Sequence, residues 1–317
     1  MGKNILVPID FSKVSEEVVR LADEWAQRNH ATLHCLRVIN HTLREVEGES
    51  RASFLEEFET YLQELNILSP YQSYLEFDLS YRGIISLADT IDADLILMAA
   101  HSHTLLGRLF LGSNTDYVVH HCHCPVYVHK QHPEAFSNKI IVPLDYTEVN
   151  KPVVKYADTW AQRTGAELYF IHVEPELEYV KSAYATGTRA YPQAYARSMM
   201  EYAGGAVAMD IRTSLGADDL SIEESLQRKK EEELMVAQRT LEEYVAALDV
   251  KSKHQMIFQT GKPYLAMRDL QQKTLAGLVM MAAHSHTLLN RLFVGSNTDY
   301  LLHHLNCPMY VYKEKNS

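Results

Sequence analysis

The second half of this 317-residue sequence repeats the first half, and that repeat limits the folds open to the chain. Residues 98–106 (MAAHSHTLL) recur unchanged at residues 281–289, and residues 112–117 (GSNTDY) recur unchanged at residues 295–300. Such identities, in a fixed order and at a fixed spacing, indicate a duplicated unit. The chain is about twice as long as an ordinary domain, which agrees with two copies of one domain.

The spacing between equivalent residues changes along the chain and so locates an insertion. Asp10 and Asp145, in the related segments ILVPID and IIVPLD, are 135 positions apart, whereas the later repeated segments are 183 positions apart. The second copy therefore has 48 more residues than the first, and they lie between Val173, which keeps the shorter spacing, and Tyr244. We expect one domain over residues 1–131 and a second over residues 138–314, with the insertion at about residues 175–220.

Each copy alternates short apolar runs with segments that are apolar on one side only. The apolar runs predict strands, and apolar residues at helical spacing, such as Val14, Val18 and Leu21, predict helices. The expected strands of the first copy cover residues 5–9, 32–39, 74–81, 94–100 and 125–129. The expected helices include residues 14–25, 54–65 and 84–91, and a further helix follows Ser113. Strands that alternate with helices form parallel crossovers, so we predict an α/β fold with two tandem doubly wound domains.

The charge balance and the hydropathy pattern exclude several classes of protein. There are 41 acidic and 30 basic residues, and the resulting net charge of −11 disfavours a nucleic-acid-binding protein. No apolar run approaches the roughly 18 residues of a membrane-spanning helix, and the N-terminus lacks the pattern of a signal peptide. The four cysteines are too scattered for a disulfide framework, and Cys124 and Cys307 are expected to be small buried side chains. We therefore expect a cytoplasmic protein with no membrane or nucleic-acid partner.

Three segments of each copy follow predicted strands, where open parallel sheets bind ligands. In the first copy they are Asp10 after the first strand, residues 99–103 after the fourth strand, and Gly112 with Ser113 at the start of the next helix. A helix N-terminus that begins with glycine suits a phosphate, because its free backbone N–H groups carry partial positive charge. A capping box, with Ser113 as N-cap and Asp116 as its partner, explains the same residues without a ligand.

These motifs, in this order and in both copies, resemble the universal stress protein domain. The resemblance rests on VPIDFS at residues 7–12, VPLDYT at 142–147, RLFLGS at 108–113 and CPVYV at 124–128. It covers essentially the whole chain outside the insertion. It implies a five-stranded parallel sheet in each domain, a Rossmann-like fold similar to adenine nucleotide alpha hydrolases, and a tandem chain that forms an internal pseudo-dimer. Domains of this family commonly pair through their last strands, here residues 126–129 and 309–312.

Nucleotide-binding members of this family carry a glycine motif whose spacing is intact here but whose first two glycines are replaced. The motif reads Gly, two residues, Gly, nine residues, and then Gly followed by Ser or Thr. Its positions are Ala99, Ser102, Gly112 and Ser113 in the first copy and Ala282, Ser285, Gly295 and Ser296 in the second. By the same resemblance, Asp10 and Asp145 would face ribose or adenine, and Val38 and Val173 would border the adenine. Glycine lets the backbone approach ribose and phosphate closely, so the replacements weaken the expected binding of ATP or a related adenine nucleotide.

The sequence has 16 histidines, and four of them form two pairs with the spacing of metal ligands. The pairs are His101 with His103 and His284 with His286. Alternate residues of an extended segment point to one side, so each pair is a candidate for zinc ligation, although a pair is not a complete site. Neighbouring histidines at residues 120–121 and 303–304 lie on predicted helices, where adjacent residues do not share a face. The segment CHC at residues 122–124 is not repeated in the second copy.

The insertion is rich in tyrosine and then in charge. Its tyrosines are Tyr179, Tyr184, Tyr191, Tyr195 and Tyr202, and a helix is predicted from Ser221 towards Leu248. The tyrosines suit a lid over a strand-end pocket, a surface for a protein partner, or a surface segment that packs its own aromatic rings.

No arrangement of nucleophile, base and acid repeats in the two copies, and the sequence has no P-loop or nucleophile-elbow motif. We predict a non-enzymatic stress-response factor that binds an adenine nucleotide at the strand-end loops of one or both domains. The alternatives are an enzyme that hydrolyses ATP slowly and an interaction scaffold that needs no ligand or responds to zinc.

Overall fold

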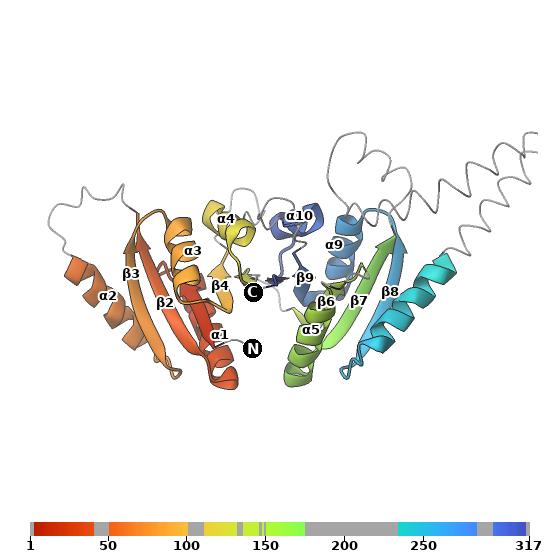
Figure 1. The fold of residues 1–317 in the computed structure, drawn as a ribbon, viewed down its shortest axis with the longest axis horizontal. Coiled ribbons are helices and arrows are strands. Elements are labelled where there is room, and N and C mark those ends of the chain that lie inside the picture. Colours follow the sequence, from red (N-terminus) through yellow and green to blue (C-terminus); the bar gives the residue numbers. More distant parts are fainter. Residues whose placement is uncertain are drawn as a thin grey trace, which may run out of the picture.

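Ten strands form one continuous sheet in the computed structural model of this chain (Figure 1). The structure describes residues 3–40, 51–100, 111–131, 136–145, 148, 150–174, 234–283 and 294–314. The tyrosine-rich part of the insertion and the start of its predicted helix lie outside these residues. The described end of that helix covers residues 234–247.

Strands and helices alternate along both domains, as the sequence predicts. Domain 1 consists of β1 (Asn4–Pro8), α1 (Lys13–Asn29), β2 (Thr32–Ile39), α2 (Arg51–Glu64), β3 (Tyr71–Phe77), α3 (Ser80–Thr90), β4 (Leu95–Ala99), α4 (Ser113–His121) and β5 (Val126–His129). Domain 2 consists of β6 (Ser137–Pro143), α5 (Asn150–Thr164), β7 (Glu167–Glu174), the helix over residues 234–247, β8 (His254–Thr260), α9 (Pro263–Thr274), β9 (Ala276–Ala282), α10 (Ser296–His304) and β10 (Met309–Tyr312). The predicted α/β fold with two tandem doubly wound domains is confirmed.

The two domains join through their last strands. The strand order is β3-β2-β1-β4-β5-β10-β9-β6-β7-β8, and the pairs within each domain are parallel. In the middle of the sheet β5 and β10 are antiparallel, with Tyr127 opposite Tyr310. Equivalent residues of the two copies therefore face each other across an approximate twofold axis, and the expected internal pseudo-dimer is confirmed.

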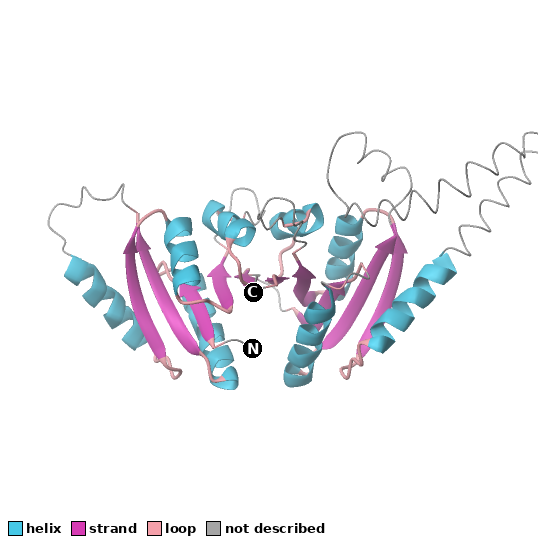
Figure 2. Cartoon of the chain, viewed as in Figure 1, coloured by secondary structure: helices cyan, strands magenta, loops and turns pink. Residues whose placement is uncertain are grey.

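Helices cover both faces of the sheet (Figure 2). Successive strand residues point to opposite faces, so Ile5 and Val7 belong to one buried apolar cluster and Leu6 belongs to the other. The first cluster packs against α1, α2, α5 and the helix over residues 234–247, and the second packs against α3, α4, α9 and α10. The result is a three-layer sandwich whose inner strands are buried on both faces, as is usual for parallel sheets.

The third strand of domain 1 differs from the sequence prediction. β3 begins three residues before the predicted strand over residues 74–81 and stops four residues before its end. Its first residues, Tyr71 and Gln72, are exposed because β3 is the outer strand of the sheet. Apolar patterning cannot detect exposed strand residues, so the start of β3 is missed. At the end of the predicted strand, Tyr81 already belongs to α3.

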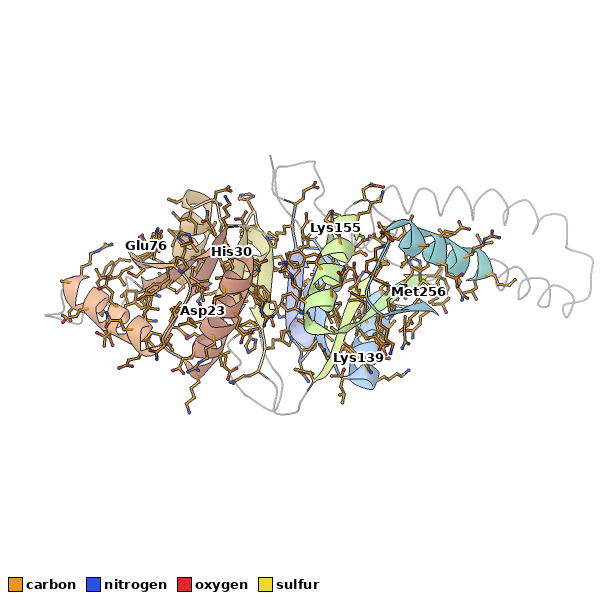
Figure 3. The ribbon with its side chains drawn as sticks, turned by 90° about the horizontal axis from the view of Figure 1, so that it is seen from below. Asp23, His30, Glu76, Lys139, Lys155 and Met256 are labelled. Atoms are coloured by element: carbon orange, nitrogen blue, oxygen red, sulfur yellow. The ribbon has the colours of Figure 1, made fainter. Side chains whose placement is uncertain are left out.

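Equivalent aspartates anchor the loop that precedes the outer strand of each domain. Asp23 on α1 (Figure 3) accepts a hydrogen bond from the backbone N–H of Ser69 at 2.8 Å. Asp158, its equivalent on α5, accepts one from the backbone N–H of Ser252, also at 2.8 Å. In each case burial alone would raise the pKa of the carboxyl, but the hydrogen bonds it accepts outweigh burial and lower that pKa.

Aromatic residues pack the seam between the domains on the face that carries α1 and α5. The indole centroids of the equivalent residues Trp25 and Trp160 lie 4.4 Å apart in an edge-to-face arrangement. The rings of Tyr156 and Tyr310 stack at 4.8 Å. A cavity of about 220 Å³, lined in part by Trp25, Tyr156 and Tyr310, lies at this seam.

All four cysteines are buried and none is in a disulfide, and the burial of Cys124 and Cys307 is as expected. Within the described part of the chain, no helix has the length and apolar character needed to cross a membrane.

Candidate functional site

Asp10 and Phe11 form the loop at the carboxyl end of β1, where ligands bind in open α/β sheets. Asp10 is exposed, and its carboxylate accepts a hydrogen bond from the backbone N–H of Ser12 at 3.0 Å. Phe11 has a left-handed backbone with φ 66°, which is uncommon for a residue other than glycine. Its ring packs 4.5 Å from that of Tyr61, and the guanidinium of Arg37 lies 4.4 Å from its centroid. These contacts of Phe11 fix the loop that presents Asp10.

A polar side chain on the second strand of each domain binds the backbone beside the aspartate. Arg37 donates from Nη1 to the carbonyl of Ile9 at 3.4 Å, and burial lowers the pKa of this arginine while the charge of Asp10 opposes the shift. The equivalent residue in domain 2, His172, is buried and donates from Nδ1 to the carbonyl of Leu144 at 2.8 Å. Sequence reasoning missed both residues. The sequence does contain a sign of them, because a polar residue interrupts the apolar run of the second strand at equivalent positions in both copies.

A tyrosine lies near the aspartate in both domains. Burial raises the pKa of Tyr244 to about 12, and the negative charge of Asp145 acts in the same direction. In domain 1 burial also raises the pKa of Tyr61, to which the charge of Asp10 contributes. Each aspartate therefore has a neutral phenol in its surroundings at physiological pH. Asp145 also accepts a hydrogen bond from the side chain of Asn150.

The residues expected to border the base and the ribose lie at the carboxyl ends of strands. Val38 on β2 is half-buried and packs closely on Gly83, where an added Cβ would lie only 3.1 Å from the valine Cγ2. Val173, its equivalent on β7, is buried. Ala99 and Ala282 end β4 and β9, and both are buried in the apolar cluster that packs against α1 and α5. The methyl groups that replace the first glycine of the family motif are thus part of the core.

The capping box expected at the start of α4 is wrong. Gly112 is the N-cap residue, with φ −66° and ψ 145°, and Ser113 is already helical. The backbone N–H of Asp116 donates to the carbonyl of Gly112 at 3.0 Å, and no side chain caps the helix. Because Ser113 lies one residue inside the helix, its hydroxyl does not occupy the N-cap position. Gly295 caps α10 in the same way.

Thr115 connects the first turn of α4 to the end of β4. It is buried, and its hydroxyl donates to the carbonyl of Ala99 at 3.2 Å. Because β4 pairs with β1, the structure brings Asp10, Ala99 and the Gly112–Ser113 helix start to the same edge of the sheet. The remaining predicted positions, Ser102, Ser285, His101, His103, His284 and His286, lie outside the described residues.

Two solved structures share the fold over nearly the whole length of this chain. A universal stress protein from Archaeoglobus fulgidus DSM 4304 matches with a TM-score of 0.62 and 18% identity over 98% of each chain. A putative universal stress protein from Pseudomonas aeruginosa UCBPP-PA14 matches with a TM-score of 0.59 and 15% identity over 98% of this chain and 93% of the other. At identities this low, the structural similarity shows a common fold and nothing more about function.

Similarity in sequence extends over both halves. Universal stress protein A homolog 1 of Coxiella burnetii (strain RSA 493 / Nine Mile phase I) is 31% identical over an alignment 140 positions long, which covers 39% of this chain and 93% of that protein. The sequence profile of the Universal stress protein family matches residues 1–130 and again residues 137–313. Since the two matches together span nearly the whole chain, this chain belongs to the universal stress protein family and carries two of its domains in tandem.

Proposed function

We propose that this chain is a non-enzymatic stress-response factor of the cytoplasm that binds an adenine nucleotide at the strand-end loops of one or both domains. Membership of the universal stress protein family supports the role in stress. The main support for a nucleotide ligand comes from the first residues of α4 and α10. Each helix has glycine at its N-cap, serine as its first helical residue and no side-chain cap.

Such a helix start is suited to the phosphates of a nucleotide. The first backbone N–H groups of a helix have no intrahelical acceptor, and the helix dipole gives them partial positive charge. In α4 the bond from Thr115 to the carbonyl of Ala99 keeps these groups beside the carboxyl end of β4. Asp10, at the end of the neighbouring strand β1, offers a carboxylate to a ribose hydroxyl. The net charge of −11 repels anions, so binding depends on these local donors.

Calorimetric titration of the chain with ATP and Mg²⁺, up to millimolar nucleotide, tests the proposal. Ser113→Glu and Ser296→Glu are the informative variants, because a carboxylate at the first helical position repels phosphate while it favours the helix dipole. Each variant therefore stays folded, and each should abolish the heat from its own domain. Together they identify which domain binds the nucleotide.

Ser86→Glu is the matched control, since Ser86 is exposed on α3 and the substitution adds the same charge within a helix and not at its start. It should leave the titration unchanged. No heat with wild-type protein at millimolar ATP would overturn the proposed ligand. Heat that survives in the Ser113→Glu, Ser296→Glu double variant would overturn the proposed place of the phosphates.

The non-enzymatic part of the proposal has a separate test. Protein saturated with ATP should release inorganic phosphate no faster than ATP does in buffer, because no general base and no phosphoryl-transfer motif is evident in the sequence. Sustained release that Ser113→Glu or Ser296→Glu abolishes would instead make the chain an ATPase. The cytoplasmic location rests on the four buried cysteines, none of which is in a disulfide, as suits a reducing compartment.

A further inference from the structure

Two helices from different domains carry the same pair of polar residues to the axis between the domains. α4 and α10 face each other across the centre of the molecule (Figure 1). α4 presents Asp116 and His120, and α10 presents the equivalent residues Asp299 and His303. Residues four apart on a helix lie on one face, so each helix directs an aspartate and a histidine to the same place.

Two distances across the axis and one within α10 are close to those between the ligands of a tetrahedral metal ion. His303 Nε2 lies 3.3 Å from Asp116 Oδ1 and 3.7 Å from Asp299 Oδ1. His120 Nε2 lies 3.4 Å from Asp299 Oδ1. One ligand atom from each of Asp116, Asp299 and His303 falls within 4.8 Å of the others, and His120 joins this group of three through its contact with Asp299. Tetrahedral Zn²⁺ with bonds of about 2.0–2.2 Å separates its ligand atoms by about 3.3–3.6 Å.

An unsatisfied carboxylate oxygen points to an ion between these groups, and the orientation of His120 is compatible with one. Asp116 Oδ1 is buried and has no hydrogen-bond partner, whereas buried carboxylate oxygens are normally satisfied. His120 Nδ1 donates to the backbone carbonyl of Asp116 at 2.8 Å. In its neutral form, with the proton on Nδ1, His120 turns the Nε2 lone pair towards Asp299, the orientation that metal-bound histidines usually have.

The electrostatics of the cluster also favour a dication. Pairing of the domains brings the Asp116 and Asp299 carboxylates together, and two negative charges at this separation repel each other. Two carboxylates and two neutral imidazoles neutralise one divalent cation. The Asp116 and His120 side chains are 37% and 26% exposed, so an ion can enter from solvent.

The neighbouring histidines are turned away from this cluster. His121 stacks on Tyr117 with ring centroids 3.8 Å apart, and His304 stacks on Tyr300 at the same distance. Each donates from Nδ1 to the backbone carbonyl of its tyrosine, at 2.8 Å for His121 and 2.7 Å for His304. They supply controls with the same chemistry, one residue away.

We propose that Asp116, His120, Asp299 and His303 bind one divalent transition-metal ion, with Zn²⁺ the best match to this ligand set and geometry. Two ligands come from each domain, so the site is complete only when β5 pairs with β10. The bound ion fastens α4 to α10 across the pseudo-twofold axis.

Metal-stripped protein titrated with Zn²⁺ in a calorimeter, with metal content measured after dialysis, tests the site. Wild-type protein should bind one ion per chain at the axis. Asp299→Asn and His303→Gln should each weaken binding at least about 100-fold, because even outer-shell substitutions at metal sites cost 10–100-fold. Asp299→Asn also removes the repulsion between the carboxylates, so the metal-free variant should be at least as stable as wild type. His121→Gln and His304→Gln should bind Zn²⁺ as wild type does.

Two more measurements separate this site from other zinc sites. Co²⁺ in place of Zn²⁺ should give the intense visible bands of tetrahedral cobalt, and Asp299→Asn should lose them. Zn²⁺ should raise the melting temperature of wild type but not that of Asp299→Asn. Unchanged zinc affinity in Asp299→Asn and His303→Gln would overturn the proposal. So would a site lost in His101→Gln, His284→Gln but kept in the axis variants, or no uptake of Zn²⁺ by wild type.

Discussion

Lys130 and Lys313 each bind the end of a helix in the domain to which they do not belong. Lys130 Nζ donates to the backbone carbonyls of Leu302 at 2.5 Å and Leu305 at 2.8 Å, at the end of α10. Lys313 Nζ donates in return to the carbonyl of Val119 at 2.5 Å, near the end of α4. Both lysines are almost fully buried. Each ammonium satisfies carbonyls that a helix end leaves without partners, so the exchange fastens the domains together.

Lys130→Met should destabilise the folded chain. The substitution keeps the apolar stem but leaves the carbonyls of Leu302 and Leu305 without their buried donor, at an expected loss of about 1–3 kcal/mol in the free energy of unfolding. Urea unfolding followed by circular dichroism measures the loss. Lys155→Met, on the exposed side of α5, is the control and should change stability by less than about 0.5 kcal/mol. Equal losses in the two variants would contradict this role of Lys130.

The stabilisation from Lys130 should increase at alkaline pH. Burial lowers the pKa of Lys130 to about 8, whereas an unfolded lysine titrates near 10.4. Between these values the folded chain binds fewer protons than the unfolded chain, so stability from this residue rises with pH. The neutral amine still has two N–H donors for the two carbonyls. The difference in unfolding free energy between wild type and Lys130→Met should therefore be larger at about pH 9.5 than at pH 7; a difference that shrinks would refute the prediction.

Asp23→Asn should remove stability at neutral pH and little at low pH. The carboxylate accepts from the backbone N–H groups of Leu68 and Ser69 at 3.1 and 2.8 Å, and the amide keeps only one accepting oxygen. Hydrogen bonds lower the folded-state pKa of Asp23, so its contribution is complete above its unfolded pKa and is lost as pH falls through the folded value. We expect a loss of about 1–2 kcal/mol at pH 7 that decreases as the pH falls below 3.8 and through the lowered folded-state pKa of Asp23. Asp89→Asn, exposed on α3, is the matched control and should show neither effect.

The four thiols should resist alkylation and disulfide exchange in the folded chain, because all are buried. Cys122 differs from Cys307 in the direction of its pKa shift. A hydrogen bond with Cys124 and the charge of Lys313 lower its pKa to about 6 against the effect of burial. Burial instead raises the pKa of Cys307 to about 12. With Ellman's reagent in increasing denaturant, the first thiol to react should be the one that Cys122→Ser removes. Fast reaction of any thiol in buffer would show that burial does not protect it.

The repeat predicted most of the fold because buried parallel strands leave a strong apolar signal. The strands that the sequence predicts over residues 5–9 and 94–100 agree with β1 and β4 to within a residue or two, and both strands are enclosed by helices on both faces. The predicted bounds of β3 differ from the observed ones because an outer strand exposes residues such as Tyr71. Local patterning succeeds where tertiary burial dictates the residue type, and it fails at the rim of the sheet.

The candidate site was predicted only in part, for a different reason. The sequence locates the strand end at Asp10 and the helix start at Gly112. The capping box needs Ser113 as the N-cap residue, but the helix begins one residue earlier than that, with Gly112 as its N-cap. The convergence of Asp116 with His303 could not be predicted, since it depends on how two distant helices meet when the last strands pair. Lys130 resembles an ordinary surface lysine in sequence, and only the neighbouring domain explains its burial.

The antiparallel seam has a consequence for how this molecule tolerates change. In an assembly of two identical chains, every substitution near the symmetry axis is made twice, and its benefit or damage is doubled. Here the residues that meet at the seam, such as Tyr127 and Tyr310, are encoded separately. One half can therefore acquire a new side chain, or 48 extra residues on one flank, while the other half keeps the ancestral contact.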